Sequence, residues 1–308
     1  ELDKNSRISE RKLAKAVGRS KESVRYRISK LVENGILKRF TTWIDPTKVG
    51  YQSAKIYVTL ANIPQRKKEF IKFARNDKRL FWFAIAEGAW NAGMTFFVKD
   101  NEEFFNLKNE IFTKFKDLII DSYTASLVSV HYYGKTYIYN GETPQVVMFN
   151  KVEDYVLGDI SVKVLKELFL NSRVNIVSLA NKYKTSVEII KNRIKKLEEQ
   201  KIIVRYTIDV DFQKLNYDFY KTFLYFHNIN ESDLKKLMEY SKRAPNIRFL
   251  VKQISPWDIE LEVMAKSNKE YNEIISKITE EFAKIIKKVE TATIVEDYIW
   301  SSKELIFE

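Results

Sequence analysis

Residues 5–36 read NSRISERKLAKAVGRSKESVRYRISKLVENGI, and residues 171–202 read NSRVNIVSLANKYKTSVEIIKNRIKKLEEQKI. The second stretch repeats the first with a shift of 166 positions, because Asn-Ser-Arg, Leu-Ala, Arg-Ile and Lys-Leu recur at matching places without a gap. Such a period exceeds the roughly 20–50 residues of a solenoid repeat, so we expect each copy to fold as an independent module. A duplicated module gives a pseudo-two-fold molecule, which suits a nearly two-fold partner such as a DNA palindrome.

Within each copy, the spacing of apolar residues predicts two short helices joined by a turn. In the first copy Ser9 and Ser20 are good helix N-caps, and Gly18 ends the first helix. Apolar residues recur at helical spacing at Leu13, Ala14, Val17, Val24, Ile28 and Leu31 in the first copy and at Leu179, Ala180, Tyr183, Ile190, Ile194 and Leu197 in the second. Two such helices make a helix-turn-helix, whose second helix enters the DNA major groove.

The polar face of the second helix and the turn before it supply the candidate DNA-binding residues. In the first copy these are Arg19, Ser20, Lys21, Ser23, Arg25, Tyr26 and Lys30, and in the second copy Ser186, Lys191, Asn192 and Lys195. The β-rich stretches 36–45 and 202–211 that follow predict the wing of a winged helix. Arg39 and Arg205 lie in these stretches, where a phosphate contact and a structural role at the base of the wing both stay open.

The positive charge of the chain is concentrated in the same two segments. Residues 1–43 contain 12 Lys and Arg against 5 Asp and Glu, and residues 159–209 contain 11 against 6. The formal net charge of the whole chain is +12, so the remaining residues contribute no net charge. An isolated basic run is often only a solvated helix face, but its occurrence in both copies favours binding of a polyanion.

The composition excludes several kinds of site. The chain has no cysteine, which removes disulfide scaffolds, thiolate metal sites and cysteine nucleophiles. It has two histidines and lacks a glycine-rich phosphate loop, an HExxH pattern and a serine-elbow motif. We therefore expect no catalytic residues, no metal and no cofactor, and a protein that is not an enzyme.

No stretch of the sequence has the features of a membrane segment. The longest apolar runs are strand-like pieces such as Leu80 to Ala86, far below the roughly 18 residues that a membrane span needs. The sequence also begins without a hydrophobic signal segment. A cytoplasmic protein that does not contact membranes is the expectation.

Both copies continue with strand and helix patterns in the order βαββαβ. The expected elements are, in the first copy, strands 55–60, 80–86, 93–98 and 122–132 with helices 66–76 and 101–118, and in the second copy, strands 221–226, 247–254, 258–265 and 290–299 with helices 232–242 and 268–286. This order predicts a ferredoxin-like α+β domain, an antiparallel sheet with both helices on one face. The open face of each sheet has to be buried, and the sheet of the other copy is the expected cover.

The repeat also predicts the domain boundaries. We expect a winged helix-turn-helix at 1–43, a ferredoxin-like domain at 44–139, a linker at 140–158, a second winged helix-turn-helix at 159–209 and a second ferredoxin-like domain at 210–308. Glu1-Leu2 aligns with Glu167-Leu168, so the first copy lacks a counterpart of residues 159–166. The first helix of the first copy is accordingly expected to be truncated.

The helix-turn-helix with Asn-Ser-Arg, Leu-Ala, Arg-Ile and Lys-Leu-Val-Glu-Asn-Gly-Ile, the wing that ends near Gly50-Tyr51 and the βαββαβ pattern together resemble the leucine-responsive and asparagine regulators, the Lrp/AsnC family. The resemblance covers nearly the whole chain, with the family unit in tandem. It implies a DNA-binding domain followed by a domain of the RAM type, which dimerises through its sheet and often senses an amino acid. The implied function is transcriptional regulation through binding of double-stranded DNA.

The resemblance also points to a loop between the second and third strands, where family members bind their effector with a Gly and an Asp. The matching residues are Gly88, Trp90 and Asn91 in the first copy and Trp257 and Asp258 in the second, where Ser255 replaces the Gly. Because the Asn91 amide holds an ammonium group less strongly than a carboxylate does, an amino acid is a doubtful effector. A different small molecule, or a structural role in which the two tryptophans fill the sheet interface, are the alternatives.

Two other functions stay open on the sequence. Siroheme decarboxylases share the tandem architecture and act on a tetrapyrrole with histidines and arginines, although His131 and His227 do not occupy equivalent positions here. An architectural protein that coats DNA is the second alternative. For the quaternary state, the sheets can pair within one chain as an internal pseudo-dimer or between chains as a homo-oligomer.

Overall fold

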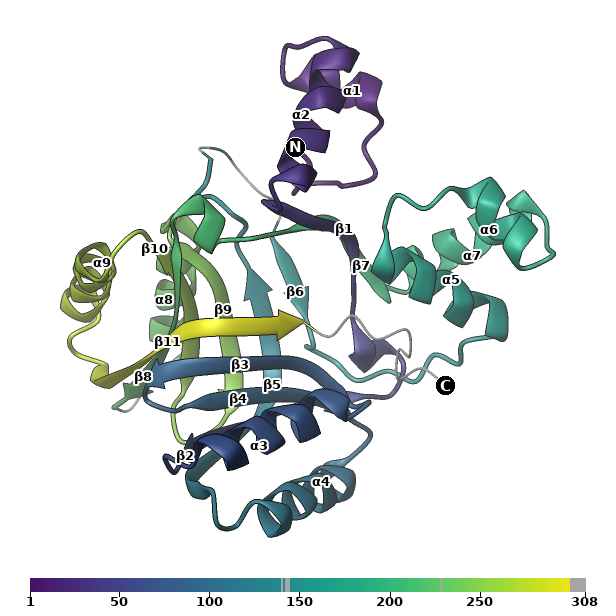
Figure 1. Ribbon diagram of the computed structural model, residues 1–308. Helices are drawn as coiled ribbons and strands as arrows, with labels where there is room; N and C mark the ends of the chain where they lie inside the picture. The colour runs from purple at the N-terminus through teal and green to yellow at the C-terminus, as the bar shows by residue number, and fades with distance from the viewer. Residues whose placement is uncertain (140, 142–144, 228, 300–308) are drawn as a thin grey trace. The chain divides into compact units, whose positions relative to one another are not determined.

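The computed structural model describes residues 1–139, 141, 145–227 and 229–299, which form two compact units (Figure 1). The first unit consists of residues 1–49 and 153–216, and the second consists of residues 50–152 and 217–299. Each unit thus combines equivalent segments of the two copies. The expectation that each copy folds as an independent module is wrong, because equivalent segments pack with one another instead.

The first copy contributes two short helices to the first unit. They are α1, Glu10–Ala16, and α2, Lys21–Glu33, and both begin at the expected serine caps. The Oγ of Ser20 accepts the backbone N–H of Ser23 at 3.1 Å. Gly18 adopts a φ of 61°, a left-handed conformation that ends α1 without the strain a side chain would cause. The buried core between the helices is small and consists of Leu13, Ala14 and Val24.

The second copy contributes three helices and a larger core. They are α5, Asp159–Leu170, α6, Ile176–Lys182, and α7, Val187–Glu199. Helix α5 packs against α7 and against strand β1, Leu37–Ile44. The buried apolar residues are Val164, Leu165, Leu168, Leu179, Ala180, Ile190, Ile194, Leu197, Ile202 and Ile203. This arrangement gives α7 a buried side that α2 has only in part.

A two-stranded antiparallel ribbon joins the two copies within the first unit. Strand β1 pairs with β7, Ile203–Val210, with Thr41 opposite Thr207. The stretches predicted to be wings supply these two strands, one from each copy, and the two strands pair with each other. The Ser6 and Ser172 hydroxyls lie 2.6 Å apart next to this ribbon. Short 3₁₀ helices, η1 at Pro46–Lys48 and η2 at Gln213–Leu215, lead out of the two strands.

The second unit contains the βαββαβ order twice, as the sequence predicts. The elements of the first copy are β2 Gln52–Leu60, α3 Pro64–Asn76, β3 Leu80–Gly88, β4 Ala92–Val98, α4 Asn101–Lys114 and β5 Ile119–Tyr132. Those of the second copy are β8 Asp218–Phe226, α8 Glu231–Arg243, β9 Ile247–Ile254, β10 Ile259–Ala265, α9 Asn268–Glu281 and β11 Ile286–Ile299.

The two four-stranded sheets join at both edges and close into a ring. Strand β11 pairs with β3, β9 pairs with β5, and β5 also pairs with β2, so eight strands follow one another in the order β2-β4-β3-β11-β8-β10-β9-β5. A short strand, β6 at Val146–Met148, lies in the segment expected to be a linker and pairs antiparallel with the end of β5. Because the two sheets pair along both edges, the eight strands of the ring leave no open strand edge of the kind that favours aggregation.

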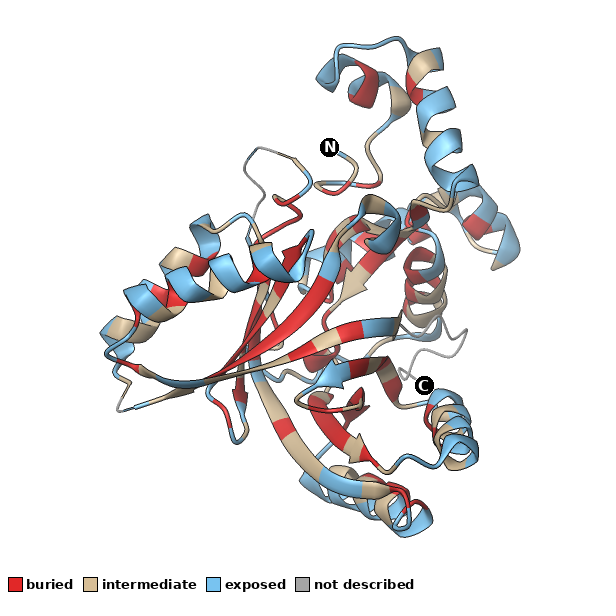
Figure 2. Cartoon of the chain, turned by 60° about the vertical axis from the view of Figure 1, so that its left-hand side comes forward, coloured by how far each residue is buried: buried red, intermediate tan, exposed pale blue. Residues whose placement is uncertain are grey.

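The closed ring has two kinds of surface. Its outer face is covered by α3 and α4 over one sheet and by α8 and α9 over the other, each above its own apolar core. Buried positions run along most of the strands while the outer sides of the helices are exposed (Figure 2). The inner face encloses a mixture of aromatic and charged side chains. Among the described residues, no helix is long and apolar enough to cross a bilayer.

Candidate nucleic-acid interface

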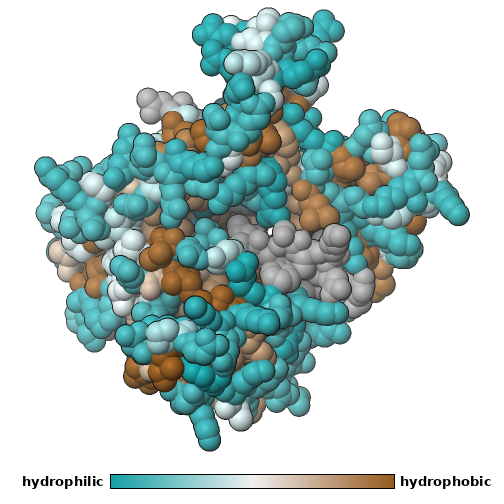
Figure 3. Space-filling view, viewed as in Figure 1, coloured by the Kyte–Doolittle hydropathy of each residue, from teal (hydrophilic) through white to brown (hydrophobic). Residues whose placement is uncertain are grey.

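Helix α2 presents most of the candidate residues of the first copy to solvent. The side chains of Arg19, Lys21, Arg25, Tyr26 and Lys30 are exposed, and Ser20 is engaged as the N-cap. Tyr26 is 63% exposed, although an aromatic ring of this size is normally buried. Hydrophilic side chains cover most of the visible face of the α1–α2 segment (Figure 3). The surface is accordingly cationic, with one aromatic ring on it.

An acidic residue that the sequence analysis did not identify binds the central arginine of this helix. Glu10, in the first turn of α1, accepts two hydrogen bonds from Arg25, at 2.8 and 3.3 Å, and lies 3.9 Å from Lys21. The Arg25 hydrogen bond lowers the pKa of Glu10 below its ordinary value. Arg25 has to exchange this carboxylate for DNA if it reads a base. The charge of Glu10 at a helix start was visible in the sequence, but its contact with α2 depends on how the two helices pack.

Helix α7 presents the corresponding surface of the second copy without such an acidic partner. Ser186 caps the helix by accepting the N–H of Ile189 at 3.1 Å, and Lys191, Asn192 and Lys195 are exposed. Lys195 lies 3.7 Å from Glu199, one helical turn away. The position equivalent to Glu10 is Ile176, so no carboxylate occupies that place in the second copy. The cations of α7 are therefore freer to meet an anion than those of α2.

The two arginines of the ribbon have structural contacts, and their part in DNA binding stays a prediction. Arg205 is buried and donates to the backbone oxygen of Asp3 at 2.6 Å and to its carboxylate at 3.2 Å. Arg39 forms an ion pair with Asp209 on the neighbouring strand and covers the ring of Phe169. Of the two roles that the sequence left open, the structural one is the role these contacts support.

The loops expected to bind an effector close the ends of two strands. Asn91 Oδ1 accepts a hydrogen bond from the N–H of Leu60 at 2.9 Å, and Asp258 Oδ2 accepts one from the N–H of Phe226 at 2.8 Å. The two side chains thus make equivalent hydrogen bonds in the two copies. Gly88 has a φ of 110°, and a Cβ there would lie 2.4 Å from the backbone oxygen of Thr291. Both the backbone angle and the close approach require glycine at this position.

The tryptophans of these loops enter the ring and meet there. Trp90 and Trp257 are 1% and 2% exposed, and both contact Tyr57, with ring centroids 5.0 and 5.4 Å away. Their indole N–H groups have no acceptor among the described residues. These contacts agree with the alternative in which the two tryptophans fill the interface between the sheets. Binding of an effector stays a prediction.

A buried ion network lies beside these aromatic rings and was not anticipated. Glu260 is fully buried and accepts hydrogen bonds from Lys55 at 2.9 Å, from Lys221 at 2.5 Å and from the Tyr57 hydroxyl at 2.8 Å. Lys221 also binds Glu262 at 2.8 Å. Burial raises the pKa of Glu260, but the two ammonium groups outweigh it and hold that pKa well below its ordinary value. A sequence in which lysine and glutamate alternate with apolar residues gives no sign that these charges face inward.

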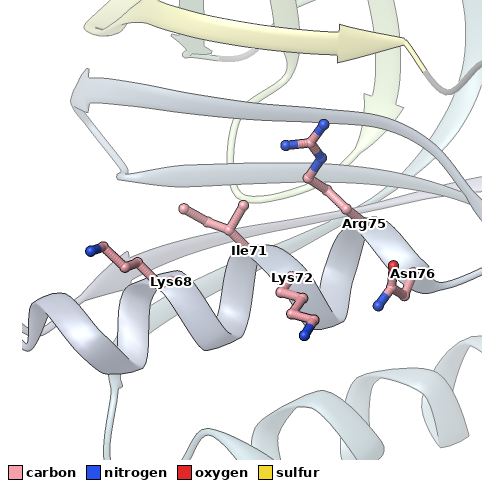
Figure 4. Close-up of a pocket in the computed structure, with 5 residues that line it drawn as sticks. All are labelled: Lys68, Ile71, Lys72, Arg75 and Asn76. Atoms are coloured by element: carbon pink, nitrogen blue, oxygen red, sulfur yellow. The ribbon is translucent and has the colours of Figure 1, made fainter.

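A shallow basic hollow lies on the outer face of α3 (Figure 4). It has a volume of about 430 Å³ and is lined by Lys68, Ile71, Lys72, Arg75 and Asn76. The Arg75 guanidinium stacks on the ring of Tyr298 at 4.1 Å from its centroid. None of the candidate residues contributes to this hollow.

The two histidines occupy separate places in the second unit. His131 on β5 is paired with Leu250, a residue of the helix-covered core, so its ring lies on the outer face of the ring of strands, within 3.1 Å of the Ser129 hydroxyl. His227 is exposed just after β8. Neither histidine belongs to the group of side chains that meet inside the ring.

Comparison with known proteins agrees with the helix-turn-helix assignment. Residues 1–38 match the family described as winged helix-turn-helix DNA-binding. The chain is 26% identical over 133 residues to the HTH-type transcriptional regulator LrpC of Bacillus subtilis strain 168, a match that covers 43% of this chain and 90% of LrpC. It is 29% identical over 122 residues to an uncharacterised HTH-type transcriptional regulator of Pyrococcus abyssi, covering 39% of this chain and 81% of that protein.

Over its full length the chain has the fold of a solved enzyme structure. The crystal structure of the siroheme decarboxylase NirDL in complex with an iron-uroporphyrin III analogue superimposes with a TM-score of 0.65 and covers 98% of this chain and 91% of that one. The identity is 16%, so the likeness is one of fold alone. The curated relatives that this chain matches are named as HTH-type transcriptional regulators, and the likeness covers about two fifths of the chain.

Proposed function

We propose that the protein is a DNA-binding transcriptional regulator that reads duplex DNA with two non-identical recognition helices, α2 and α7. The observation that carries this proposal is the pair of serine-capped helices whose cationic faces are exposed in one compact unit. Cations of this kind neutralise phosphates, and helices of this kind fit the major groove. The names of the relatives support the same function.

The two helices are proposed to prefer different bases. Arg25 is suited to guanine, because its guanidinium can donate two hydrogen bonds to that base in the major groove. Asn192 is suited to adenine, because its amide can donate one hydrogen bond to that base and accept another. Lys21 and Tyr26 join Arg25 in the first helix, and Lys191 joins Asn192 in the second. The half-sites are expected to lie about 10 base pairs or a multiple of that apart. The bound site is accordingly asymmetric or only pseudo-palindromic.

The proposed origin of this asymmetry is a duplication of one family unit within the chain. The repeated βαββαβ order and the shared frame of residues 5–36 and 171–202 support it. After such a duplication, the two copies are free to change their DNA-facing residues separately. A covalently joined pair of unlike copies then replaces a dimer of like chains.

Selection of bound sequences from random duplex DNA at near-physiological salt tests the proposal. We expect enrichment of one asymmetric site, and loss of affinity for that site in Lys21→Glu/Arg25→Glu and in Lys191→Glu. Lys269→Glu is the matched control, because Lys269 is an exposed lysine on α9 outside the candidate interface. Equal binding to random duplex would instead support an architectural protein, and unchanged binding of all three variants would remove α2 and α7 from the interface.

A tetrapyrrole enzyme is the alternative that the fold likeness to the siroheme decarboxylase raises. The placement of His131 on the outer face and of His227 in solvent does not favour it. Titration of the purified protein with an iron porphyrin, followed by visible absorbance, distinguishes the two functions. A saturable shift of the absorbance band with release of carbon dioxide would support the enzyme.

A further inference from the structure

The two halves of the ring carry different charges at equivalent positions of their strands. On β2 and β4, Lys55 lies opposite Thr95 and Tyr57 lies opposite Gly93. On β8 and β10, Lys221 lies opposite Glu262 and Phe223 lies opposite Glu260. Both halves therefore contribute one lysine, but only the second half contributes carboxylates. The first half contributes a tyrosine hydroxyl where the second has phenylalanine.

Lys55 finds a carboxylate partner only when one half meets the other, and Arg248 is a further buried cation of the second half near Glu262. Lys55 crosses the ring to reach Glu260, while Lys221 binds Glu260 and Glu262 within its own half. The two ammonium groups and two carboxylates sum to zero. The side chains of Lys55, Lys221 and Glu260 are at most 6% exposed, so water contributes little to their solvation. A buried charge without a partner is strongly destabilising in such a place.

Pairing of either half with a second copy of itself would leave buried polar groups without their partners. Two first halves would enclose two Lys55 ammonium groups facing Gly93 and Thr95, with no carboxylate at these register positions. Two second halves would enclose two Lys221 and two Arg248 cations with four carboxylates, and each Glu260 would lose the Tyr57 hydroxyl because Phe223 stands at the equivalent position. Gln253, which donates to Glu260 at 3.2 Å, corresponds to Ala86 and is likewise supplied by the second half alone.

We propose that this network is a pairing code, which makes residues 50–132 the partner of residues 217–299 and makes each half incompatible with a second copy of itself. The code explains why the ring is built from unlike halves although the two halves share one strand order. It acts by excluding wrong partners, since like charges at an interface oppose association.

Two full-length variants with reversed charges test the code. Lys55→Glu places a third carboxylate in the ring, and Glu260→Lys places a third ammonium group there, so each variant alone should unfold at lower urea than the wild type. When both variants are co-expressed, each chain can exchange halves with the other. The introduced carboxylate then meets the introduced ammonium group in one ring, and the original Lys55 meets the original Glu260 in the second ring.

Native mass spectrometry with one chain isotope-labelled measures the outcome. We expect a heterodimer of the two variants to exceed self-associated chains by about tenfold or more, since like-charge contacts cost several kcal/mol. Wild-type chains mixed in the same way should show no such exchange preference. A mixture of variants that contains self-associated chains only, or a Lys55→Glu variant that unfolds at the same urea concentration as the wild type, would overturn the proposal.

Two variants with neutral replacements, Glu260→Gln and Glu260→Gln/Lys55→Met, keep the test decisive if the charge-reversed chains fail to fold. Glu260→Gln leaves two ammonium groups with only Glu262, and Lys55→Met added to it removes the unmatched one. The double variant should therefore unfold at a urea concentration equal to or higher than that of Glu260→Gln alone. Additive losses in the double variant would show that the residues do not act as a charge pair, and would overturn the code. Lys287→Glu, at an exposed lysine, controls for the change in net charge.

Discussion

The two copies keep a capping serine before their second helix and the same apolar spacing, yet they bury the apolar residues to different extents. Leu197 on α7 is 1% exposed, whereas its counterpart Leu31 on α2 is 37% exposed. The difference arises because α5 packs against α7, while residues 1–9, which precede α1, form turns and extended chain. A shared sequence frame thus fixes the helices but leaves their stability to the element that covers them.

The halves of the ring differ in the same direction. The second copy supplies Glu260, Glu262 and Gln253, whereas the first supplies Gly93, Thr95 and Ala86, respectively, at the equivalent positions. In both units the second copy thus carries more of the groups on which folding depends. In the first copy, Glu10 holds Arg25, a residue of the candidate DNA-binding surface.

The largest expected effect of a single substitution is in the ring. Glu260→Gln should lower the free energy of unfolding by about 3–5 kcal/mol, because it leaves two buried ammonium groups with one carboxylate. In the first copy, Thr95→Val, at the position equivalent to Glu262, removes one buried hydroxyl and should cost about 1 kcal/mol. Urea unfolding followed by tryptophan fluorescence measures both, and equal losses would contradict the division between the halves.

The same carboxylate makes the stability of the ring sensitive to acid. The pKa of Glu260 in the folded protein is below its ordinary value of 4.5, so its contribution is complete above pH 4.5 and is lost as the pH falls towards the folded-state pKa. The wild type should lose stability over this range more steeply than Glu260→Gln does. Parallel pH dependences of the two proteins would show that Glu260 does not carry this term.

The next effect compares the two recognition helices. Leu197→Ala should destabilise the second helix-turn-helix by about 2–4 kcal/mol, because it opens a cavity in a ten-residue core. Leu31→Ala removes a partly exposed side chain and should cost below about 1 kcal/mol. Hydrogen exchange measured on peptides from α7 and α2 reports each effect locally. A larger loss of protection in α2 than in α7 would contradict the difference in burial between the two helices.

A smaller change is expected in DNA affinity. Asn192→Ala and Arg25→Ala should each weaken binding to the selected site by about tenfold, with relaxed base preference in a different half-site for each variant. Fluorescence anisotropy with single-base variants of the site measures both quantities. Loss of preference in the same half-site for both variants would break the assignment of one helix to each half.

The smallest effect concerns the acidic residue of the first copy. Glu10→Gln frees Arg25 and removes a carboxylate from the interface, so affinity should rise about two- to fivefold, the range of a surface ion pair. The gain should vanish in a Glu10→Gln/Arg25→Ala background. Ile176→Gln, at the equivalent position of the second copy, is the matched control and should leave the affinity unchanged.

Much of the secondary structure was predictable because its signals are local. The serine caps, the glycine at 18 and the helical spacing of apolar residues each act over a few positions, and the helices begin where these signals place them. The βαββαβ order followed from strand and helix periods in the same way. The residues of the candidate interface were likewise readable, because exposed polar positions of an amphipathic helix follow from its period.

The tertiary pairings were not predictable from these patterns. Pairing of β1 with β7 and closure of the ring through β3 and β11 join positions that are 159 or more residues apart. For Arg205, Lys55 and Glu260, the sequence gives a charged residue in a strand and leaves open which face is buried. Only the register of the strands places Arg205 beside Asp3, or Glu260 beside two lysines.

Selection of bound sequences with three proteins tests directly whether the two unlike recognition helices read one DNA site. The wild type, an α2 variant with Lys21, Arg25 and Tyr26 replaced by Ala, and an α7 variant with Lys191 and Asn192 replaced by Ala are each selected against random duplex DNA. We expect an asymmetric site for the wild type, with one half-site lost in each variant and a different half-site in the two cases. A perfect palindrome for the wild type, or loss of the same half-site in both variants, would contradict it.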